Sequence, residues 1–428
     1  MKTQKKKKEE EKKVIIVGHS LNDAGGLSFV ASELIKKYLS LKYFIGYINI
    51  SPVEMNVNGF VKFGITTNKC HIINCNIYDP NHKDIFDTFY KDFKCDLVIT
   101  LHDPWLLDHV IYSIYRNNFY WVAYQTFETN NYPEKVTAST AIYPFQNSPK
   151  SLPNIFKSCD LVIPCSKGGC ESLKKLGIEQ DEHIYLGTNI IDKFQVDFLK
   201  SKNKSDIFGS SVSDDDFIFA TIGVNNQRKK LDKTLEAFAK FVKSKNYSVK
   251  YKLYLHSDLK RNFNGTDIIQ LIKELKIAKN VIIESTEISK NLLYDRLAVI
   301  DCYISLHGAE GFGLPFIEAM MFDKPCIYTN YSTPAEYCDP ELGVSYNNFV
   351  YAPNFCLSLA IADTDHAVNI ISKVVDGKYK NKKYGYDYVE KNFNIKTNIK
   401  KFIDIVKENY SEWKKDDTKL RIPIKRVI

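Results

Sequence analysis

The chain lacks any apolar run long enough to cross a membrane. Its 428 residues contain no stretch near the roughly 18 apolar residues that a spanning helix needs. Cysteine pairs with C-x-x-C spacing are also missing, although there are 10 Cys, which argues against a zinc site. Several of these cysteines sit in apolar, strand-like runs, and no signal peptide is recognisable. We therefore expect reduced thiols and a cytoplasmic protein without a metal centre.

A basic folded surface is missing as well, despite a formal net charge of +8. Residues 1–13 carry seven Lys and three Glu, and the last eight residues carry three basic side chains. The body between them is close to neutral, with 49 basic and 48 acidic residues. A nucleic-acid footprint should lie on a folded face rather than in tails. We therefore predict solvated tails and no nucleic-acid partner, and we leave contact with an anionic membrane surface open.

What the sequence does contain is two series of alternating strand-like and helix-like segments. The first begins with an apolar run, a loop with two glycines and an amphipathic segment from about Leu27. Its strand-like runs lie at 14–18, 43–50, 97–101, 120–124 and 161–164. The second series begins at residue 217 and includes apolar positions of helical spacing at 231, 235, 238 and 242. Such alternation predicts mostly parallel sheets with helices on both faces.

The chain is therefore predicted to be an α/β protein with two doubly wound, Rossmann-like domains that face each other across a cleft. Polar residues 192–216 lack periodicity and are interpreted as a linker or an exposed loop. The predicted divisions are a charged tail at 1–13, an N-terminal domain at 14–195, a linker at 196–216, a C-terminal domain at 217–395, and a C-terminal helix with a basic tail at 396–428. Packing of that last helix on the N-terminal domain is left open.

The segment SLHGAEGFGLPFIE at 305–318 places two carboxylates around a tight loop. Glu310 lies in the loop after an apolar run, and Glu318 falls one turn inside the helix that follows. Gly311 and Gly313 let backbone amides approach a ligand closely, which suits an anionic group. Carboxylates beside them would accept hydrogen bonds from hydroxyls. The combination indicates a nucleotide sugar; the alternative is a surface loop with a glutamate near a helix N-terminus.

This segment resembles the signature of retaining glycosyltransferases of family 4, which have the GT-B fold. EGFGLPFIEAM matches the family pattern of Glu, seven residues and Glu. The resemblance implies that Glu310 contacts hydroxyls of the donor sugar and that Glu318 holds the ribose of the nucleotide. It also implies donor contacts from the residues between them, Gly311, Phe312, Gly313 and Leu314.

The resemblance extends to both sides of the motif. Upstream, IGVNNQRKKLDKTLEAFAKF is similar to the family's strand, basic loop and helix, and its diphosphate-binding Arg and Lys match Arg228 and Lys229. The family often has another Arg after the glycine; this chain has Val224, so that contact is absent or comes from Lys230. Downstream, DKPCIYTNYSTPAEY resembles the family's strand, loop and donor-binding Glu, here Glu336. Taken alone, QRKK would be interpreted as a solvated basic turn.

The N-terminal half matches the family more weakly. Gly25 and Gly26 stand where the family has a glycine-rich loop that approaches donor phosphate or acceptor, although a plain turn is an equal alternative. His102, after a strand-like run, matches a His that family members often carry near the reaction centre; the alternative is a structural histidine. Asp-x-Asp triplets at 213–217 and 363–365 suggest metal binding, but linker polarity and helix capping explain them better.

The resemblance implies a retaining hexosyltransferase that moves a sugar from a nucleoside diphosphate donor, such as a UDP- or GDP-sugar, to an acceptor hydroxyl. Catalysis is assigned to Glu310, Arg228, Lys229 and His102. The N-terminal domain would bind the acceptor and the C-terminal domain the donor. No cofactor or metal is expected, and the acceptor would be a glycan or a lipid-linked or protein-linked group. Alternatives are a sugar-nucleotide epimerase, a phosphorylase of the same fold, and a non-catalytic glycan- or nucleotide-binding scaffold.

Overall fold

The computed structural model describes residues 11–22, 25–51, 55–76, 82–128, 152–260, 264–352, 357–380 and 383–415. These residues form two compact units. Unit 1 contains described residues 11–125, 152–163 and 399–415, and unit 2 contains 126–128 and 164–398. Among the helices of the described ranges, none combines the length and the apolar character that crossing a membrane would require.

Unit 1 is built on a six-stranded sheet with the order β3-β2-β1-β4-β5-β6. Its strands are β1 (Lys13–Gly18), β2 (Phe44–Ile50), β3 (Cys70–Cys75), β4 (Leu97–Leu101), β5 (Tyr120–Gln125) and β6 (Leu161–Pro164). The central strands β1, β4 and β5 are buried almost throughout, as expected for parallel strands that are covered on both faces. Neighbouring strands from β3 to β5 pair in parallel.

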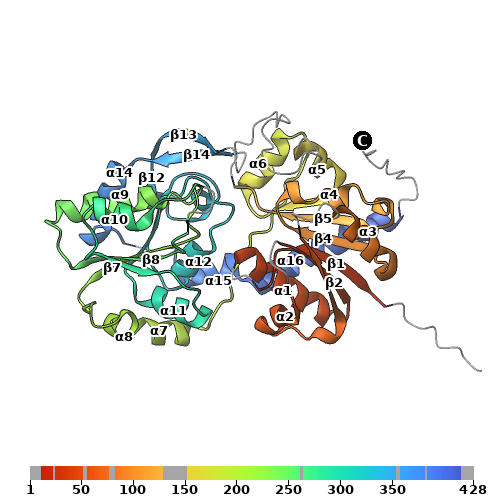
Figure 1. The fold of residues 1–428 in the computed structure, drawn as a ribbon, viewed down its shortest axis with the longest axis horizontal. Coiled ribbons are helices and arrows are strands. Elements are labelled where there is room, and N and C mark those ends of the chain that lie inside the picture. Colours follow the sequence, from red (N-terminus) through yellow and green to blue (C-terminus); the bar gives the residue numbers. More distant parts are fainter. Residues whose placement is uncertain are drawn as a thin grey trace, which may run out of the picture. The chain divides into compact units, whose positions relative to one another are not determined.

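The helices of unit 1 lie on both sides of this sheet (Figure 1). They are α1 (Gly26–Ser40), α2 (Val57–Lys62), α3 (His82–Phe93), α4 (Asp108–Ile111), α5 (Leu152–Ser158) and most of α16 (Ile395–Lys415). Helix α16 packs on β5 through aromatic rings: Tyr124 stacks on Phe402 at 4.6 Å between centroids, and Tyr120 lies against Trp413 at 5.6 Å. The C-terminal helix is thus part of unit 1.

Unit 2 repeats the same topology with the order β12-β11-β10-β7-β8-β9. Its strands are β7 (Phe217–Ile222), β8 (Tyr251–His256), β9 (Val281–Glu284), β10 (Cys302–Ser305), β11 (Cys326–Thr329) and β12 (Gly343–Val344), and all neighbouring pairs are parallel. An antiparallel hairpin, β13 (Tyr346–Ala352) and β14 (Leu357–Ala362), is added to it.

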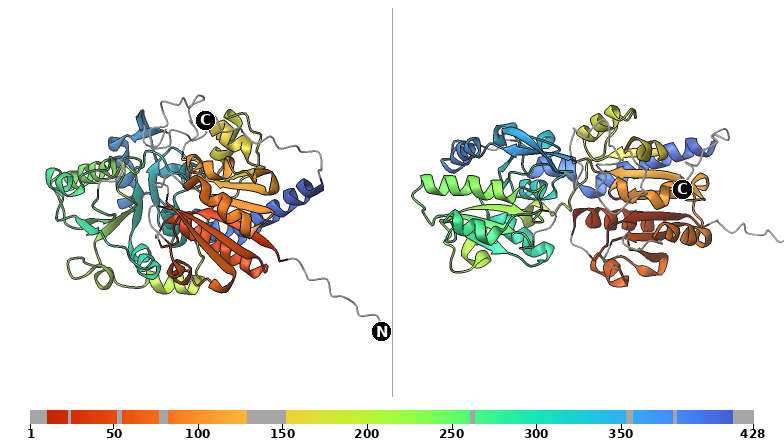
Figure 2. Two further views of the ribbon diagram at one scale, coloured as in Figure 1. Left: turned by 45° about the vertical axis from the view of Figure 1, so that its right-hand side comes forward. Right: turned by 45° about the horizontal axis from the view of Figure 1, so that its top comes forward.

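Helices cover both faces of the second sheet, as the two further views also show (Figure 2). The helices assigned to unit 2 are α6 (Lys167–Lys175), which follows β6, and α7 (Lys193–Lys200), α8 (Lys204–Phe208), α9 (Leu231–Ser244), α10 (Ile268–Glu274), α11 (Lys290–Val299), α12 (Leu314–Met321), α13 (Pro334–Tyr337), α14 (Thr364–Val375) and α15 (Tyr386–Phe393). Helices α9 and α14 pack against each other on one face, whereas α11 lies with α7 and α8 on the other. Two doubly wound, Rossmann-like units confirm the predicted α/β class.

The segment predicted as a linker or exposed loop contains two short helices. Residues 193–208 form α7 and α8, and both helices contact α11 within unit 2. Asp192 caps α7 by accepting a hydrogen bond from the amide of Gln195 at 2.9 Å. The sequence signal was weak because these helices are short and present mostly polar side chains. Tertiary contacts with α11, rather than intrinsic propensity, account for their formation.

Both sheets have the strand order 3-2-1-4-5-6 within their unit, and this order fixes where a ligand can bind. The order reverses between β1 and β4 in unit 1 and between β7 and β10 in unit 2. Ligands of such sheets bind beyond the carboxyl ends of the strands at this switch point, where the two adjacent loops separate. Ligand-binding side chains are therefore expected in the loops after these four strands.

Candidate donor site

The switch point of unit 2 brings together the two motifs singled out in the sequence. The loop after β7 carries Arg228 and Lys229, and the loop after β10 carries Glu310. Because β7 and β10 are paired, these loops are adjacent although about 80 residues separate them. The amide of Gly308 donates a hydrogen bond of 2.8 Å to the carbonyl of Arg228, which ties the loops directly.

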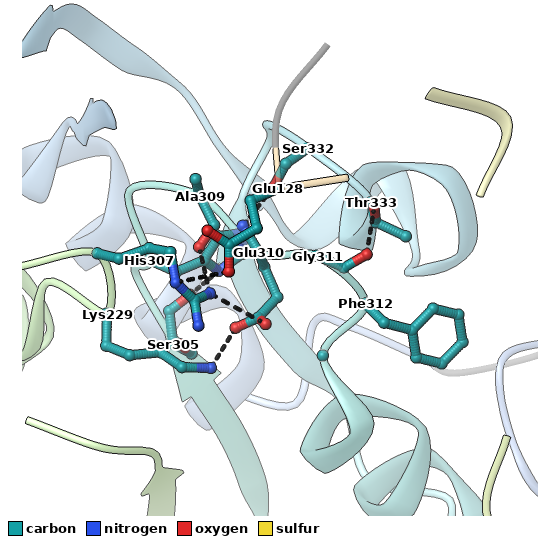
Figure 3. Close-up of polar contacts among 12 residues, drawn as sticks. Glu128, Lys229, Ser305, His307, Ala309, Glu310, Gly311, Phe312, Ser332 and Thr333 are labelled. Atoms are coloured by element: carbon teal, nitrogen blue, oxygen red, sulfur yellow. Dashed lines mark hydrogen bonds and ion pairs between the residues drawn. The ribbon is translucent and has the colours of Figure 1, made fainter. Parts of the chain in front are cut away.

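Glu310 is held between two cations (Figure 3). Its Oε2 forms an ion pair with Lys229 Nζ, and its Oε1 accepts a hydrogen bond of 3.2 Å from Nη1 of Arg228. The same Nη1 also donates to the carbonyl of Ala309 at 3.1 Å. The Glu310 side chain is buried, and the side chains of the two cations are each 14% exposed. The predicted sugar-binding carboxylate and the predicted diphosphate clamp thus form one network.

A second carboxylate, which the sequence did not predict, joins this network. Glu128 Oε1 forms an ion pair of 3.0 Å with Nε of Arg228. Glu128 follows β5 but belongs to unit 2. Gly311 permits its approach: a Cβ on that glycine would come within 3.4 Å of Cγ of Glu128 and 3.3 Å of Cβ of Thr126. The network is a chain of alternating charges, Glu128–Arg228–Glu310–Lys229.

The loop that carries Glu310 is fixed by hydroxyl groups from the segment after β11. The amide of Glu310 donates to Oγ of Ser332 at 3.0 Å, and Oγ1 of Thr333 donates to the carbonyl of Gly311, also at 3.0 Å. Tyr337 donates its hydroxyl to the carbonyls of Phe312 and Gly313. Gly313 has a φ of 86°, which a residue with a side chain adopts only with strain. Leu314 then begins α12, with Pro315 in its first turn as expected.

The pKa values of Glu310 and Lys229 are both lowered, but by different causes. Burial opposes ionisation of Glu310, but Lys229 and then Arg228 outweigh it and lower the pKa of Glu310 to about 2. For Lys229, burial is the largest effect, and it lowers the pKa of the ammonium group even though Glu310 counteracts it. The carboxylate is ionised at neutral pH, while the net contribution of the pair to stability is limited by desolvation.

The lowered pKa of Glu310 predicts how stability depends on acid pH. A carboxyl whose pKa falls on folding contributes stability above its ordinary pKa and loses that contribution as pH falls through the folded value. We therefore expect the difference in unfolding free energy between the wild type and Glu310→Gln to be constant above about pH 4.5 and to shrink toward pH 2. Urea denaturation at a series of pH values measures it. A difference independent of pH over this range would contradict the ionised, paired carboxylate.

Glu318, the second predicted donor carboxylate, is almost completely buried and has its own partners. Its Oε1 forms an ion pair with Nζ of Lys290 and accepts a hydrogen bond of 3.3 Å from Oγ1 of Thr188. Lys290 is the first residue of α11, a position at which the helix dipole disfavours a cation. Its pairing with Glu318 offsets that disadvantage. The sequence missed both partners, because neither lies near a recognisable motif.

Substituting Lys290 by Met should destabilise the protein more than breaking an exposed ion pair. Glu318 would keep its charge in a buried position with the Thr188 hydroxyl as its remaining described partner, at a cost of about 1–3 kcal/mol. The matched control is Lys373→Met, which removes the 2.6 Å pair with Glu341; that pair is exposed and worth about 0–1 kcal/mol. Urea denaturation compares them. Equal effects of the two substitutions would show that Lys290 is not needed to neutralise Glu318.

Glu336 lies elsewhere in the unit and binds the start of α6. Its carboxylate accepts hydrogen bonds from the amides of Lys167 at 2.9 Å and Gly168 at 2.7 Å, and from the hydroxyl of Tyr185 at 3.2 Å. These are amides that a helix N-terminus leaves without intrahelical partners. The structure thus gives Glu336 a capping function, and donor binding by this residue stays a prediction.

The switch point of unit 1 carries the remaining predicted residues. His102 follows β4 and stacks on His19, which follows β1, with ring centroids 3.9 Å apart. Its Nε2 lies 3.0 Å from the carbonyl of Ile50, and its Nδ1 accepts the amide of Asp103 at 2.8 Å. Burial, followed by the neighbouring His19, lowers the pKa of His102, so the ring is neutral at neutral pH. Gly26 begins α1 and Gly25 is its N-cap.

Three potential metal positions have side-chain contacts that bear on metal binding. Side-chain atoms of His19, His102 and Asp103 lie within 4.8 Å of one another. Since both ring nitrogens of His102 already have backbone partners, an ion would have to displace one of them. Asp363 of the second Asp-x-Asp triplet caps α14 by accepting hydrogen bonds from two backbone amides, as the capping interpretation predicted. In the first triplet, Asp214 accepts hydrogen bonds from Ser205 instead.

Solved structures of known proteins are similar to this chain over most of its length. The sucrose-phosphate synthase from Thermosynechococcus elongatus superposes with a TM-score of 0.66 at 16% identity, covering 94% of this chain and 100% of that one. The lipopolysaccharide outer core galactosyltransferase WaaB gives 0.59 at 16% identity, over 92% and 99%. The chain has the GT-B fold. The pneumococcal O-GlcNAc transferase GtfA, solved with UDP and GlcNAc, shares it with a TM-score of 0.61 at 10% identity, over 93% and 99%.

One family model matches part of the sequence. Residues 203–356 match the model of Glycosyl transferases group 1. The matched segment contains Arg228, Lys229, Glu310, Glu318 and Glu336, but not Glu128 or His102. No curated protein sequence is similar enough to be counted as a relative.

Proposed function

We propose that this GT-B protein is a retaining glycosyltransferase that transfers a sugar from a nucleoside diphosphate donor to an acceptor hydroxyl. The observation that carries the proposal is the network of Glu310, Arg228 and Lys229 at the switch point of unit 2. It combines a buried ionised carboxylate with two cations in the place where such sheets bind ligands. The match of residues 203–356 to Glycosyl transferases group 1 supports it.

Each group of the network has a defined task in this reaction. Glu310 accepts hydrogen bonds from sugar hydroxyls and thereby orients the sugar. Arg228 and Lys229 bind the diphosphate and stabilise the negative charge that grows on it as the glycosidic bond breaks. Charged hydrogen bonds of this kind act strongly because the side chains are largely shielded from water. The acceptor hydroxyl attacks the anomeric carbon from the face that the diphosphate leaves, and the leaving phosphate oxygen accepts its proton, so the reaction needs neither a protein base nor a protein nucleophile.

Glu318 is assigned to the ribose of the donor. A carboxylate that accepts hydrogen bonds from both ribose hydroxyls needs its charge and a fixed orientation, and Lys290 and Thr188 supply both. The protein supplies the cations that neutralise the diphosphate, and we propose that it needs no metal ion. UDP or GDP is the proposed nucleotide, and a glycan or a lipid-linked or protein-linked hydroxyl is the proposed acceptor.

A ligand screen followed by a product assay tests the proposal. Thermal unfolding is measured with UDP-, GDP-, ADP- and dTDP-sugars, and any stabilising donor is then incubated with candidate acceptors. Proton NMR of the product gives the anomeric configuration, which should be that of the donor. The control is Glu341→Gln, which changes an exposed glutamate outside the site and should behave like the wild type.

The outcomes separate the alternatives. Stabilisation by one donor together with a retained anomeric centre supports the proposal. Inversion of the centre would refute the retaining assignment. Formation of an epimeric nucleotide sugar from the donor, without an acceptor, would identify an epimerase. Failure of every donor to bind would favour a non-catalytic scaffold. Absorbance of a lysine-bound pyridoxal group would identify a phosphorylase.

A further inference from the structure

In the proposed donor site, the positive and negative side chains are equal in number before any ligand binds. Two cations, Arg228 and Lys229, face two carboxylates, Glu310 and Glu128, so the charges of the network sum to zero. A diphosphate brings at least two further negative charges. Placing it on these cations while both carboxylates remain would juxtapose like charges in a partly buried site, which costs affinity. One carboxylate must therefore leave its cation when the diphosphate binds.

Of the two carboxylates, Glu128 can move away from its cation more easily than Glu310 can. Its side chain is 23% exposed, compared with 9% for Glu310, so it can return to water more easily. The backbone amide of Glu310 donates a hydrogen bond to Ser332, which fixes that carboxylate in the site. Glu310 also has a separate use in the proposed reaction, because its charge is needed for the sugar hydroxyls.

Arg228 does not depend on Glu128 for its orientation. Glu128 pairs with Nε, while Nη1 donates to the carbonyl of Ala309 at 3.1 Å and to Glu310 at 3.2 Å. If Glu128 departs, these two acceptors still hold the guanidinium in the site. This separation distinguishes a competing counter-ion from a supporting side chain, since loss of a supporting side chain would misplace Arg228.

We propose that Glu128 is a displaceable counter-ion of Arg228, which pairs with it in the free protein and gives it up to the donor diphosphate. The inference rests on the proposed function. Glu128 acts through its charge on Arg228, and it lowers the affinity of the free site for diphosphates. In physical terms, part of the binding energy of each diphosphate is used to break the Glu128–Arg228 pair.

Isothermal titration with two probes, UDP and inorganic pyrophosphate, tests this inference. In Glu128→Gln both probes should bind about fivefold more tightly than to the wild type, which corresponds to one partly exposed ion pair. Pyrophosphate is included because it lacks base, ribose and sugar, and therefore reports on the cations alone. The control Glu341→Gln should bind both probes like the wild type. Thermal unfolding without ligand checks that each variant is folded, and Glu128→Ala should repeat the result.

A double-variant cycle separates this function from a structural one. In the Arg228→Gln background, adding Glu128→Gln should tighten binding of both probes by clearly less than fivefold, because the cation that pairs with Glu128 is gone and only its interaction with Lys229 and its repulsion of the diphosphate remain. Unchanged or weaker binding to Glu128→Gln would overturn the inference, as would tighter binding of UDP alone. If neither pyrophosphate nor any of UDP, GDP, ADP and dTDP binds the wild type, the diphosphate site itself is refuted and the proposed function falls with it. If both bind the wild type and only the variant disagrees, the proposed function stands.

Discussion

Replacing Glu310 by Gln should reduce sugar transfer by about 100-fold or more while the protein stays folded. The substitution keeps the shape of the side chain but removes the charge that orients donor hydroxyls, and removal of one such electrostatic contact typically costs a factor of about 10²–10³ in rate. The Gln oxygen can still accept a hydrogen bond from Arg228 or Lys229, so the loop should keep its geometry. Initial rates with the donor identified in the screen measure the effect.

Binding measurements give this prediction its control. Because Glu310 is assigned to the sugar and not to the nucleotide, Glu310→Gln should still bind UDP or GDP, whichever nucleotide the wild type binds. The loss should appear in transfer rather than in nucleotide affinity. A variant with near wild-type transfer would remove Glu310 from the reaction, and a variant that no longer folds would show that its function is structural.

Replacing Lys229 by Met should have an effect of similar size for a different reason. The change keeps the length of the side chain but removes the cation that faces both Glu310 and the proposed leaving phosphate. We expect transfer to fall by about 100-fold, because charge on the departing diphosphate is no longer stabilised. Nucleotide affinity should fall too, which distinguishes this variant from Glu310→Gln. Steady-state kinetics and titration with nucleoside diphosphate measure the two losses.

The unfolding free energy of the Lys229 variants tests whether Lys229 and Glu310 interact in solution. The single variant leaves Glu310 buried with Arg228 as its remaining described cationic partner, so its unfolding free energy should decrease. The double variant Lys229→Met, Glu310→Gln removes the uncompensated charge and should recover part of that loss, giving a non-additive cycle. Transfer should remain absent in the double variant. Strictly additive losses would mean that the two side chains are not coupled in solution.

The elements that could be predicted from the sequence are those with long apolar runs and glycine-rich ends. The predicted start of the second series at residue 217 coincides with the first residue of β7, and the apolar positions 231, 235, 238 and 242 all lie in α9. The position of Glu310 after β10 and of Arg228 after β7 follows from this alternation. The direct pairing of Glu310 with Arg228 was not predicted, because the order of strands along the chain does not show which strands are neighbours in the sheet. The structure shows that β7 and β10 are neighbours.

Other parts of the site had no signal in the sequence. Glu128 lies about 100 residues before Arg228 and outside the segment that matches Glycosyl transferases group 1. Lys290 begins an ordinary helix, and only the buried position of Glu318 makes it relevant. The hairpin of β13 and β14 was missed because β13 is exposed at all positions but its last, so its sequence lacks a clear apolar alternation. In each case the information lies in a tertiary contact.

Hydroxyl groups of Ser332, Thr333 and Tyr337 fasten the Glu310 loop from one side, and the amide of Ala360 in β14 bonds to the carbonyl of Gly308 at 2.8 Å on the other. A backbone fastened in this way has lost its conformational entropy during folding, so a ligand need not order it again. The loop is a preorganised receptor. Changes of sugar preference in this protein must therefore come from exchanging side chains on a rigid frame, and lengthening the loop would sacrifice the very rigidity that binding uses.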